Sequence, residues 1–198
     1  MRKPFGRISI NCALAFACLA GAATAQTPAP APSVAVAAPT YVSIPLEIAV
    51  NRPAADVWKR VGKFCDIGEW LQIPCTITSG KDGEFGAVRS VAGEVLVGKT
   101  ELSYIYTQTA RNDRPYNLYH GTLEARPVTA TSSKLVYTIF FDNSMLADEA
   151  AREADKARRV TTFTRALRNM KTLAEGGTLP PAPARGRGAQ PADGPQSR

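Results

Sequence analysis

The chain contains one histidine, and it is the clearest candidate for acid–base chemistry. His120 lies in a segment rich in aromatic residues, and the ordinary pKa of a histidine suits a general acid or base near neutral pH. A single histidine without carboxylates or thiols at suitable spacing cannot form a catalytic zinc site. We therefore predict no metal and no cofactor, and we keep His120 as a weak catalytic candidate. The alternative is a hydrogen-bonded structural histidine.

A second candidate is a phosphate-loop pattern, because residues 93–100 read GEVLVGKT. A phosphate loop needs a turn with converging N–H groups, followed by a helix whose N-terminus faces the phosphates. The spacer Glu-Val-Leu-Val favours a strand instead, and the following ELSYIY alternates as a strand does. The pattern therefore predicts a strand and a turn at Lys99, and no nucleotide site. The chain also has no Gly-x-Ser-x-Gly nucleophile motif.

The N-terminus has the features of a secretory signal peptide over residues 1–25. Three positive charges come first, an apolar run follows over 8–20, and Ala-Thr-Ala at 23–25 is a suitable cleavage site. The apolar run is too short to span a bilayer. We predict cleavage after Ala25 and a periplasmic or secreted protein without a stable membrane anchor. Lipidation at Cys18 is the alternative, although Phe and Ala before it make a poor lipidation signal.

Composition divides the remainder into three parts. Residues 26–39 are an uncharged Ala/Pro linker, and residues 178–198 are rich in Pro, Gly and Arg and are expected to be disordered. Residues 40–177 are long enough for one domain with one core. Of the net charge of +7, three units lie in the signal peptide and two in the tail. The remaining net charge of +2 on the domain does not indicate nucleic-acid binding, which needs a clustered basic face.

Two cysteines, Cys65 and Cys75, remain after cleavage of the signal peptide. An even pair in an exported protein predicts a disulfide, because the compartment is oxidising. The alternative is a pair of small buried thiols. A disulfide would also remove the only thiols that could serve as nucleophiles.

The order of elements follows from apolar periodicity. Residues 42–50 alternate as a half-buried strand, in which Pro45 requires an exposed edge or an irregularity. Asn-Arg-Pro at 51–53 starts a helix that glycines divide into two short helices. Short strands then alternate with turns up to Asp142, as in an antiparallel meander. A long helix follows over about 145–175, with one apolar face. That face comprises Val160, Phe163, Leu167, Met170 and Ala174.

This order resembles the START and polyketide-cyclase superfamily (SRPBCC), the helix-grip fold. The resemblance covers residues 41–175 and depends on the motifs PAADVWKRVGKFCDIGEW, GAVRSV and LSYIY and on the C-terminal helix. It implies an α+β fold in which a curved seven-stranded antiparallel sheet surrounds the long C-terminal helix, with two short helices after the first strand. It also implies that Trp58 is a core residue and that Trp70 lies near the mouth of a cavity.

The predicted function follows from the same resemblance: a small apolar or amphipathic molecule binds between the sheet and the long helix. Strand parity places Tyr104 and Tyr106 on one strand face, and Tyr137 on another that can point at the helix. A polyketide-cyclase-like or hydrolase-like enzyme and a filled-cavity interaction domain are the alternatives. Arg89 would meet an acidic ligand or, as we favour, an outward-facing glutamate. The candidate ligand-binding residues are Trp70, Tyr104, Tyr106, His120, Tyr137, Phe163 and Leu167.

Overall fold

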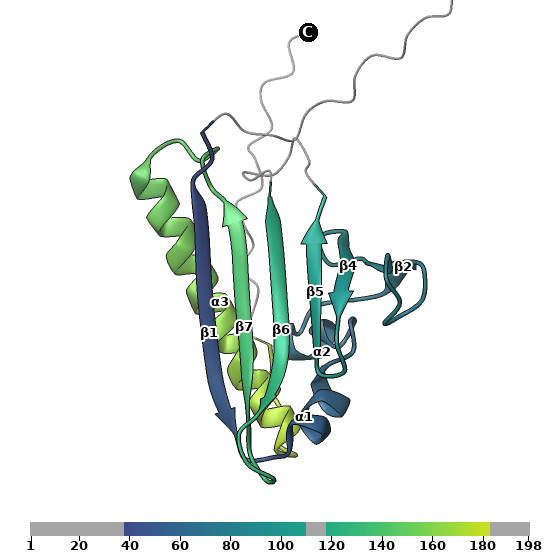
Figure 1. The fold of residues 1–198 in the computed structure, drawn as a ribbon. Helices are drawn as coiled ribbons and strands as arrows, with labels where there is room; N and C mark the ends of the chain where they lie inside the picture. The colour runs from purple at the N-terminus through teal and green to yellow at the C-terminus, as the bar shows by residue number, and fades with distance from the viewer. Residues whose placement is uncertain (1–37, 110–117, 183–198) are drawn as a thin grey trace, which may run out of the picture. The chain divides into compact units, whose positions relative to one another are not determined.

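The computed structural model describes residues 38–109 and 118–182, which form two helices, seven strands and a long final helix around one core (Figure 1). The elements in chain order are β1 (Tyr41–Val50), α1 (Ala54–Val61), α2 (Ile67–Leu71), β2 (Ile77–Ser79), β3 (Val88–Arg89), β4 (Glu94–Lys99), β5 (Ser103–Gln108), β6 (Tyr119–Pro127), β7 (Ser133–Asp142) and α3 (Glu149–Ala174). The predicted signal peptide (residues 1–25) and residues 26–37, 110–117 and 183–198 lie outside the described residues. No helix in the described ranges is both long and apolar enough to cross a membrane.

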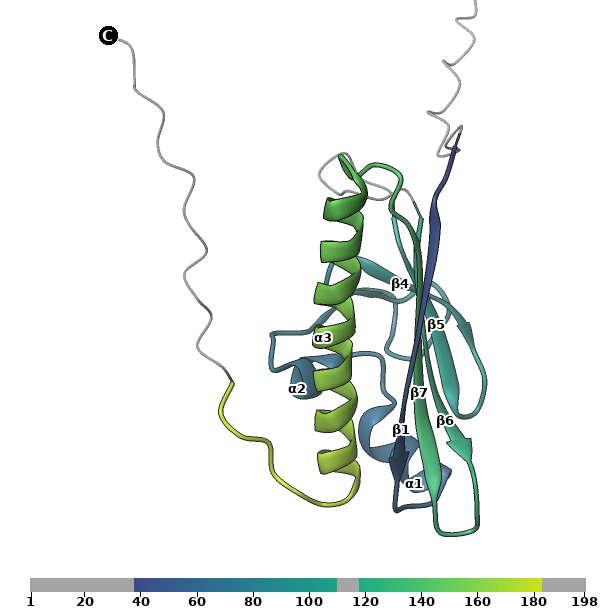
Figure 2. The same ribbon diagram turned by 90° about the vertical axis from the view of Figure 1, so that its left-hand side faces the viewer.

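The seven strands form one antiparallel sheet in the order β1-β7-β6-β5-β4-β3-β2. The sheet bends around α3, and α1 and α2 lie on the same side of the sheet as α3 (Figure 2). This arrangement confirms the helix-grip fold. Because β1 is at the end of the strand order, the missing N–H of Pro45 needs no partner strand on its free side.

The face of the sheet that packs against α3 is aromatic, as strand parity predicts. Tyr104 on β5 pairs with Leu123 on β6, which pairs with Tyr137 on β7, and all three are buried. One row away, Tyr106 pairs with Gly121. A Cβ at position 121 would lie 2.2 Å from the Tyr106 ring, so only glycine lets that ring lie flat across β6.

The inner face of α3 differs from the sequence prediction in its first half. The helix starts at Glu149 rather than Met145, with Asp148 as its N-cap accepting a hydrogen bond from the Ala151 N–H at 2.8 Å. Val160 is 36% exposed, so its assignment to the apolar face is wrong. Arg159 is buried instead, because its guanidinium lies 4.3 Å from the centre of the Phe141 ring and its Nε donates to Asp155.

The first residues of the expected C-terminal tail belong to the folded part. Leu179 packs against the core, and the side-chain amide of Gln72 donates to the Pro180 carbonyl at 2.7 Å. The prediction that the disordered tail begins at residue 178 is therefore wrong for residues 178–182, because an apolar side chain in this short segment reaches the core. The rest of the predicted tail lies outside the described residues.

The predicted disulfide between Cys65 and Cys75 is present and joins the α1–α2 connection to the segment before β2. Closing so short a loop restricts the unfolded chain by about 2–3 kcal/mol on the chain-entropy model. We expect the Cys65→Ala/Cys75→Ala double variant to lose about this much free energy of unfolding. Urea denaturation of the two proteins measures the difference. Equal stabilities, or thiols that react with a labelling reagent in the native wild type, would contradict this prediction.

Candidate ligand-binding site

A cavity of about 170 Å³ lies between the sheet and α3. It is lined from one side by α2 and the β3–β4 turn, from below by β4, β5 and β6, and from above by the middle of α3. The sequence prediction of a cavity in this place is therefore consistent with the structure. Its aromatic walls are Tyr106, Tyr119 and Phe163, its aliphatic side includes Ile67 and Leu71, and its polar groups include Glu94, Gln108, Arg158 and Arg159.

The polar side of the cavity is part of a buried ion pair. Arg89 is 0% exposed, and its Nε donates to a Glu94 carboxylate oxygen at 2.6 Å. The Gln108 amide donates to the other oxygen of Glu94 at 2.8 Å, so both oxygens of this carboxylate are bonded. The glutamate that meets Arg89 therefore points inward, and our expectation of an outward-facing one is wrong. Parity explains this: Glu94 shares its strand face with Leu96, which is also buried.

Arg89 holds its charge although it is buried. Burial lowers the pKa of the guanidinium, but the Glu94 carboxylate beside it outweighs this effect, so the pKa lies above its ordinary value. A second donor, Nη1, reaches the Phe64 carbonyl at 2.5 Å. The guanidinium also lies 4.2 Å from the centre of the Phe64 ring and 4.7 Å from that of Tyr106. These contacts fix the cation inside the fold and leave the carboxylate facing the cavity.

Two phenols meet next to this ion pair. The hydroxyls of Tyr106 and Tyr137 are hydrogen-bonded at 2.8 Å. Burial raises the pKa of both phenols well above the ordinary value, so both are neutral at physiological pH. A neutral phenol can donate or accept a hydrogen bond but is a poor base. Of the two, Tyr106 lines the cavity, so its phenol can orient a ligand but cannot easily remove a proton from it.

The structure divides the other predicted ligand residues into different environments. Tyr106 and Phe163 line the cavity. Tyr137 and Leu167 are core residues, and the Tyr137 ring packs against Phe163 with ring centres 4.8 Å apart. Trp70 is 0% exposed and packs edge-on against Tyr137 at 6.2 Å.

The two tryptophans exchange the places that the resemblance implied for them. Trp70, expected near a cavity mouth, is buried because α2 packs against α3, where the Asn169 amide donates to the Trp70 carbonyl at 2.8 Å. Trp58, expected in the core, is only half-buried and lines a different hollow together with Tyr104.

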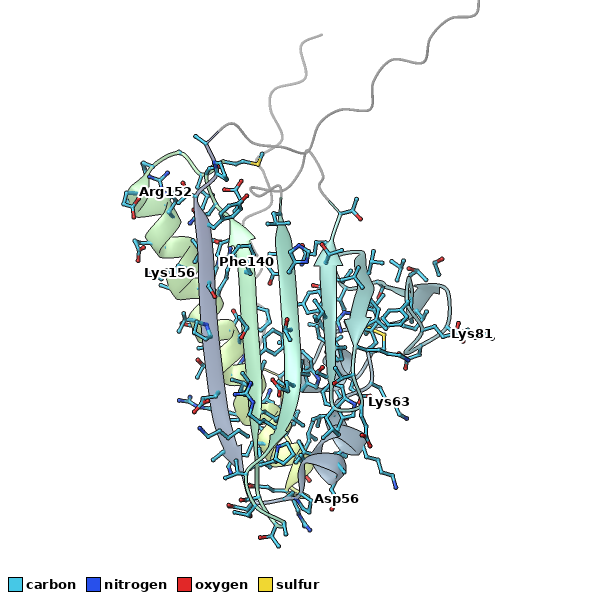
Figure 3. The ribbon with its side chains drawn as sticks, in the orientation of Figure 1. Asp56, Lys63, Lys81, Phe140, Arg152 and Lys156 are labelled. Carbon is cyan, nitrogen blue, oxygen red and sulfur yellow. A yellow bond between two sulfur atoms is a disulfide. The ribbon has the colours of Figure 1, made fainter. Side chains whose placement is uncertain are left out.

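His120 is not part of the cavity. It pairs with Phe140 on β7, and Figure 3 shows Phe140 on the face of the sheet turned away from α3. The neighbours of His120 on β6, Tyr119 and Gly121, point inward, so His120 points outward. Partial burial lowers its pKa below the ordinary value, which favours the neutral imidazole. Its prediction as a ligand or catalytic residue of the cavity is therefore wrong.

Sequence reasoning missed most of the polar side of the cavity. Gln108 has the parity of Tyr104 and Tyr106, and this signal was available from the sequence. Arg159 carried no such signal, because its burial depends on the aromatic rings of β6 and β7 that it covers. Within the described ranges, no three His, Cys, Asp or Glu side chains come together as a metal site would require.

Solved structures share this arrangement. A protein from Thermobifida fusca is 25% identical, with a TM-score of 0.57 over 69% of this chain and 97% of that one. The Zhui aromatase/cyclase from Streptomyces sp. R1128 is 18% identical, with a TM-score of 0.55 over 70% of this chain and 100% of that one. Truncated norcoclaurine synthase from Thalictrum flavum is 12% identical, with a TM-score of 0.53 over 73% and 99% of the two chains. A search of curated proteins found no match.

The fold and the cavity define a helix-grip protein, in which a curved sheet and a long helix enclose a cavity. The family model described as "Polyketide cyclase / dehydrase and lipid transport" matches residues 41–175. The chain therefore belongs to this family, and with it to the SRPBCC superfamily.

Proposed function

We propose that the protein is an exported binding protein that holds a small amphipathic molecule between its sheet and α3. The observation that supports this most directly is the cavity, in which aromatic rings face a hydrogen-bonded carboxylate. Its volume of about 170 Å³ suits a ligand with about one ring. Sites for drug-sized molecules are larger, at about 300–1,000 Å³. Aromatic walls supply apolar area, and Glu94 or Tyr106 supplies one polar contact to orient the ligand.

A cyclase-like enzyme is the second candidate function. Its support is the neutral Tyr106 phenol beside the Arg89 cation, since such a pair could stabilise negative charge on a carbonyl oxygen. Binding remains the better supported proposal, because Glu94 and the Phe64 carbonyl already engage that cation. The two candidates differ in outcome: a bound molecule is recovered unchanged from a binding protein and altered from an enzyme.

Two adjacent threonines on α3 provide a direct test of the cavity. Thr162 lines it, whereas Thr161 is exposed on the same helix. We expect 4-fluorophenol, followed by ¹⁹F NMR, to bind the wild type and Thr161→Met alike. In Thr162→Met the larger side chain fills the cavity, so the affinity should fall by about tenfold or more, equivalent to at least about 1.4 kcal/mol. Tyr106→Phe should weaken binding by about 0.5–1.5 kcal/mol if its hydroxyl contacts the ligand.

Thermal unfolding of each variant confirms that it is folded before the titration. Native mass spectrometry of the protein from a periplasmic fraction then identifies the natural ligand, and the intact mass tests cleavage after Ala25. A wild type that binds no 4-fluorophenol and carries no ligand would contradict the proposed function. Equal affinities in the two methionine variants would place the bound molecule elsewhere.

A further inference from the structure

A second, larger hollow of about 390 Å³ lies outside the cavity already described. It is enclosed by the end of α1, the segment after it, the β2–β3 loop and the β4–β5 turn. Lys63 marks its position in Figure 3, between α1 and the end of the sheet. Among the residues that the structure describes, none lines both hollows. Between them stand the rings of Phe64, Tyr104 and Tyr106, joined by the buried cation of Arg89.

The floor of this second hollow is aromatic and held in place. Trp58 is half-buried, and its ring centre lies 5.6 Å from the ring centre of Tyr104. The ring centre of Phe64 lies at the same distance, 5.6 Å, from that of Tyr104. The backbone of Gly62 lies directly under the indole, since a Cβ there would be 2.4 Å from the ring. The orientation of the indole is therefore fixed before any ligand arrives. Such a ring offers a flat apolar face on which another ring can stack.

The rim of the hollow carries charges of both signs. Two exposed ammonium groups, on Lys63 and Lys99, stand among two exposed carboxylates, on Asp82 and Glu101. Lys99 donates to the Gly83 carbonyl at 2.5 Å, which ties the end of β4 to the β2–β3 loop. The phosphate-loop pattern thus forms a strand end, and its lysine serves as one edge of this hollow.

This combination of floor and rim restricts the chemistry of an occupant. Because the rim has two charges of each sign, it gives an anion or a cation no net Coulomb attraction to offset the loss of that ion's hydration. A wholly apolar molecule would cover charged groups without giving them hydrogen bonds, which costs free energy. A hydroxyl both donates to a carboxylate and accepts from an ammonium group. We propose that the second hollow binds a neutral ring molecule with several hydroxyl groups, such as a saccharide, with its ring stacked on Trp58.

The two tryptophans of the chain allow each hollow to be observed separately. Trp58 lines the second hollow, and Trp70 is buried beside Tyr137 under α3. We expect at least one of D-glucose, D-galactose, D-mannose and N-acetyl-D-glucosamine to shift the indole N–H signal of Trp58 saturably in NMR titrations, and to leave that of Trp70 in place. D-Glucose 6-phosphate and D-glucosamine should bind about threefold or more weakly than D-glucose, because each loses hydration of its charge without a net attraction from the rim.

Substitutions on α1 and the rim test the assignment of the residues. Trp58→Ala should lower saccharide affinity by about tenfold or more, whereas Lys59→Ala, an exposed neighbour on α1, should not. Glu101→Gln leaves the rim with an excess of positive charge. It should therefore narrow the preference for D-glucose over D-glucose 6-phosphate. Glu101 is exposed, so this variant remains informative if Trp58→Ala does not fold.

Three results would overturn the inference. The first is the absence of a saturable Trp58 shift with every neutral saccharide. The second is tighter binding of the phosphate or the amine than of the neutral sugar in the wild type. The third is a ratio of the affinities for D-glucose and D-glucose 6-phosphate that is the same in Glu101→Gln as in the wild type. None of these results concerns 4-fluorophenol binding under α3, so the proposed function is tested independently of this inference.

Discussion

Replacing Arg89 with methionine is expected to lower the free energy of unfolding by about 3–5 kcal/mol. The cost arises because Glu94, 3% exposed, would keep its charge inside the fold and lose the buried guanidinium of Arg89. The Phe64 carbonyl would lose its donor in the same variant. Urea denaturation monitored by circular dichroism measures the change.

Two further variants compare the cost of breaking this buried ion pair with that of breaking an exposed one. Arg60 and Glu69 form a two-point pair with distances of 2.6 and 2.7 Å, but their side chains are 41% and 47% exposed. We expect Arg60→Met to cost no more than about 1 kcal/mol, as for surface pairs in general. The Arg89→Met/Glu94→Leu double variant should recover a large part of the loss, because the buried Glu94 charge is removed together with the Arg89 cation. If Arg89→Met costs no more than Arg60→Met, the buried pair does not stabilise the fold as we infer.

The stability of the protein is expected to fall steeply in alkaline solution. Burial raises the pKa of the phenols of Tyr104, Tyr106 and Tyr137, whereas an unfolded tyrosine titrates near pH 10. Above that pH the unfolded chain releases protons that the folded chain retains. The free energy of unfolding is therefore constant with respect to these groups below about pH 9. Above about pH 10 it decreases by about 1.4 kcal/mol per pH unit for each phenol, or about 4 kcal/mol for three.

Urea denaturation at successive pH values measures this slope, and ultraviolet absorbance of phenolate reports when the buried phenols ionise. We expect their ionisation to coincide with unfolding. Tyr106→Phe removes one of the three groups, so its slope above about pH 10 should be smaller by about 1.4 kcal/mol per pH unit. Ionisation of all phenols in a protein that is still folded would contradict the burial that we describe.

Local patterns in the sequence determined the order of elements and the disulfide. Alternation in the strands and the absence of glycine and proline from 145–175 are properties of neighbouring residues, so they can be read without the fold. The inward direction of Tyr104, Tyr106 and Tyr137 followed from the same parity and is confirmed by their burial. The same alternation indicates the direction of His120. Its neighbours Tyr119 and Gly121 are buried on the inner face of β6, so the His120 side chain lies on the outer face.

Residues outside the described ranges leave other predictions open. Cleavage after Ala25 and export stay predictions, as does the Ala/Pro linker. All three depend on segments that the structure does not describe in full. Family membership is shown, but the identity of the ligand stays a proposal.

Only the tertiary structure decided which inward-facing residues line a cavity and which fill the core. Parity gives the face of a strand, but not the distance to the helix above it. Tyr106 therefore borders empty space while Tyr137 packs against Phe163. The exchange of roles between Trp58 and Trp70 has the same origin, since α2 packs against α3 and the indole of Trp58 lines another hollow. Arg159 replaces Val160 on the inner face because aromatic rings from β6 and β7, distant in sequence, give its cation a surface to cover.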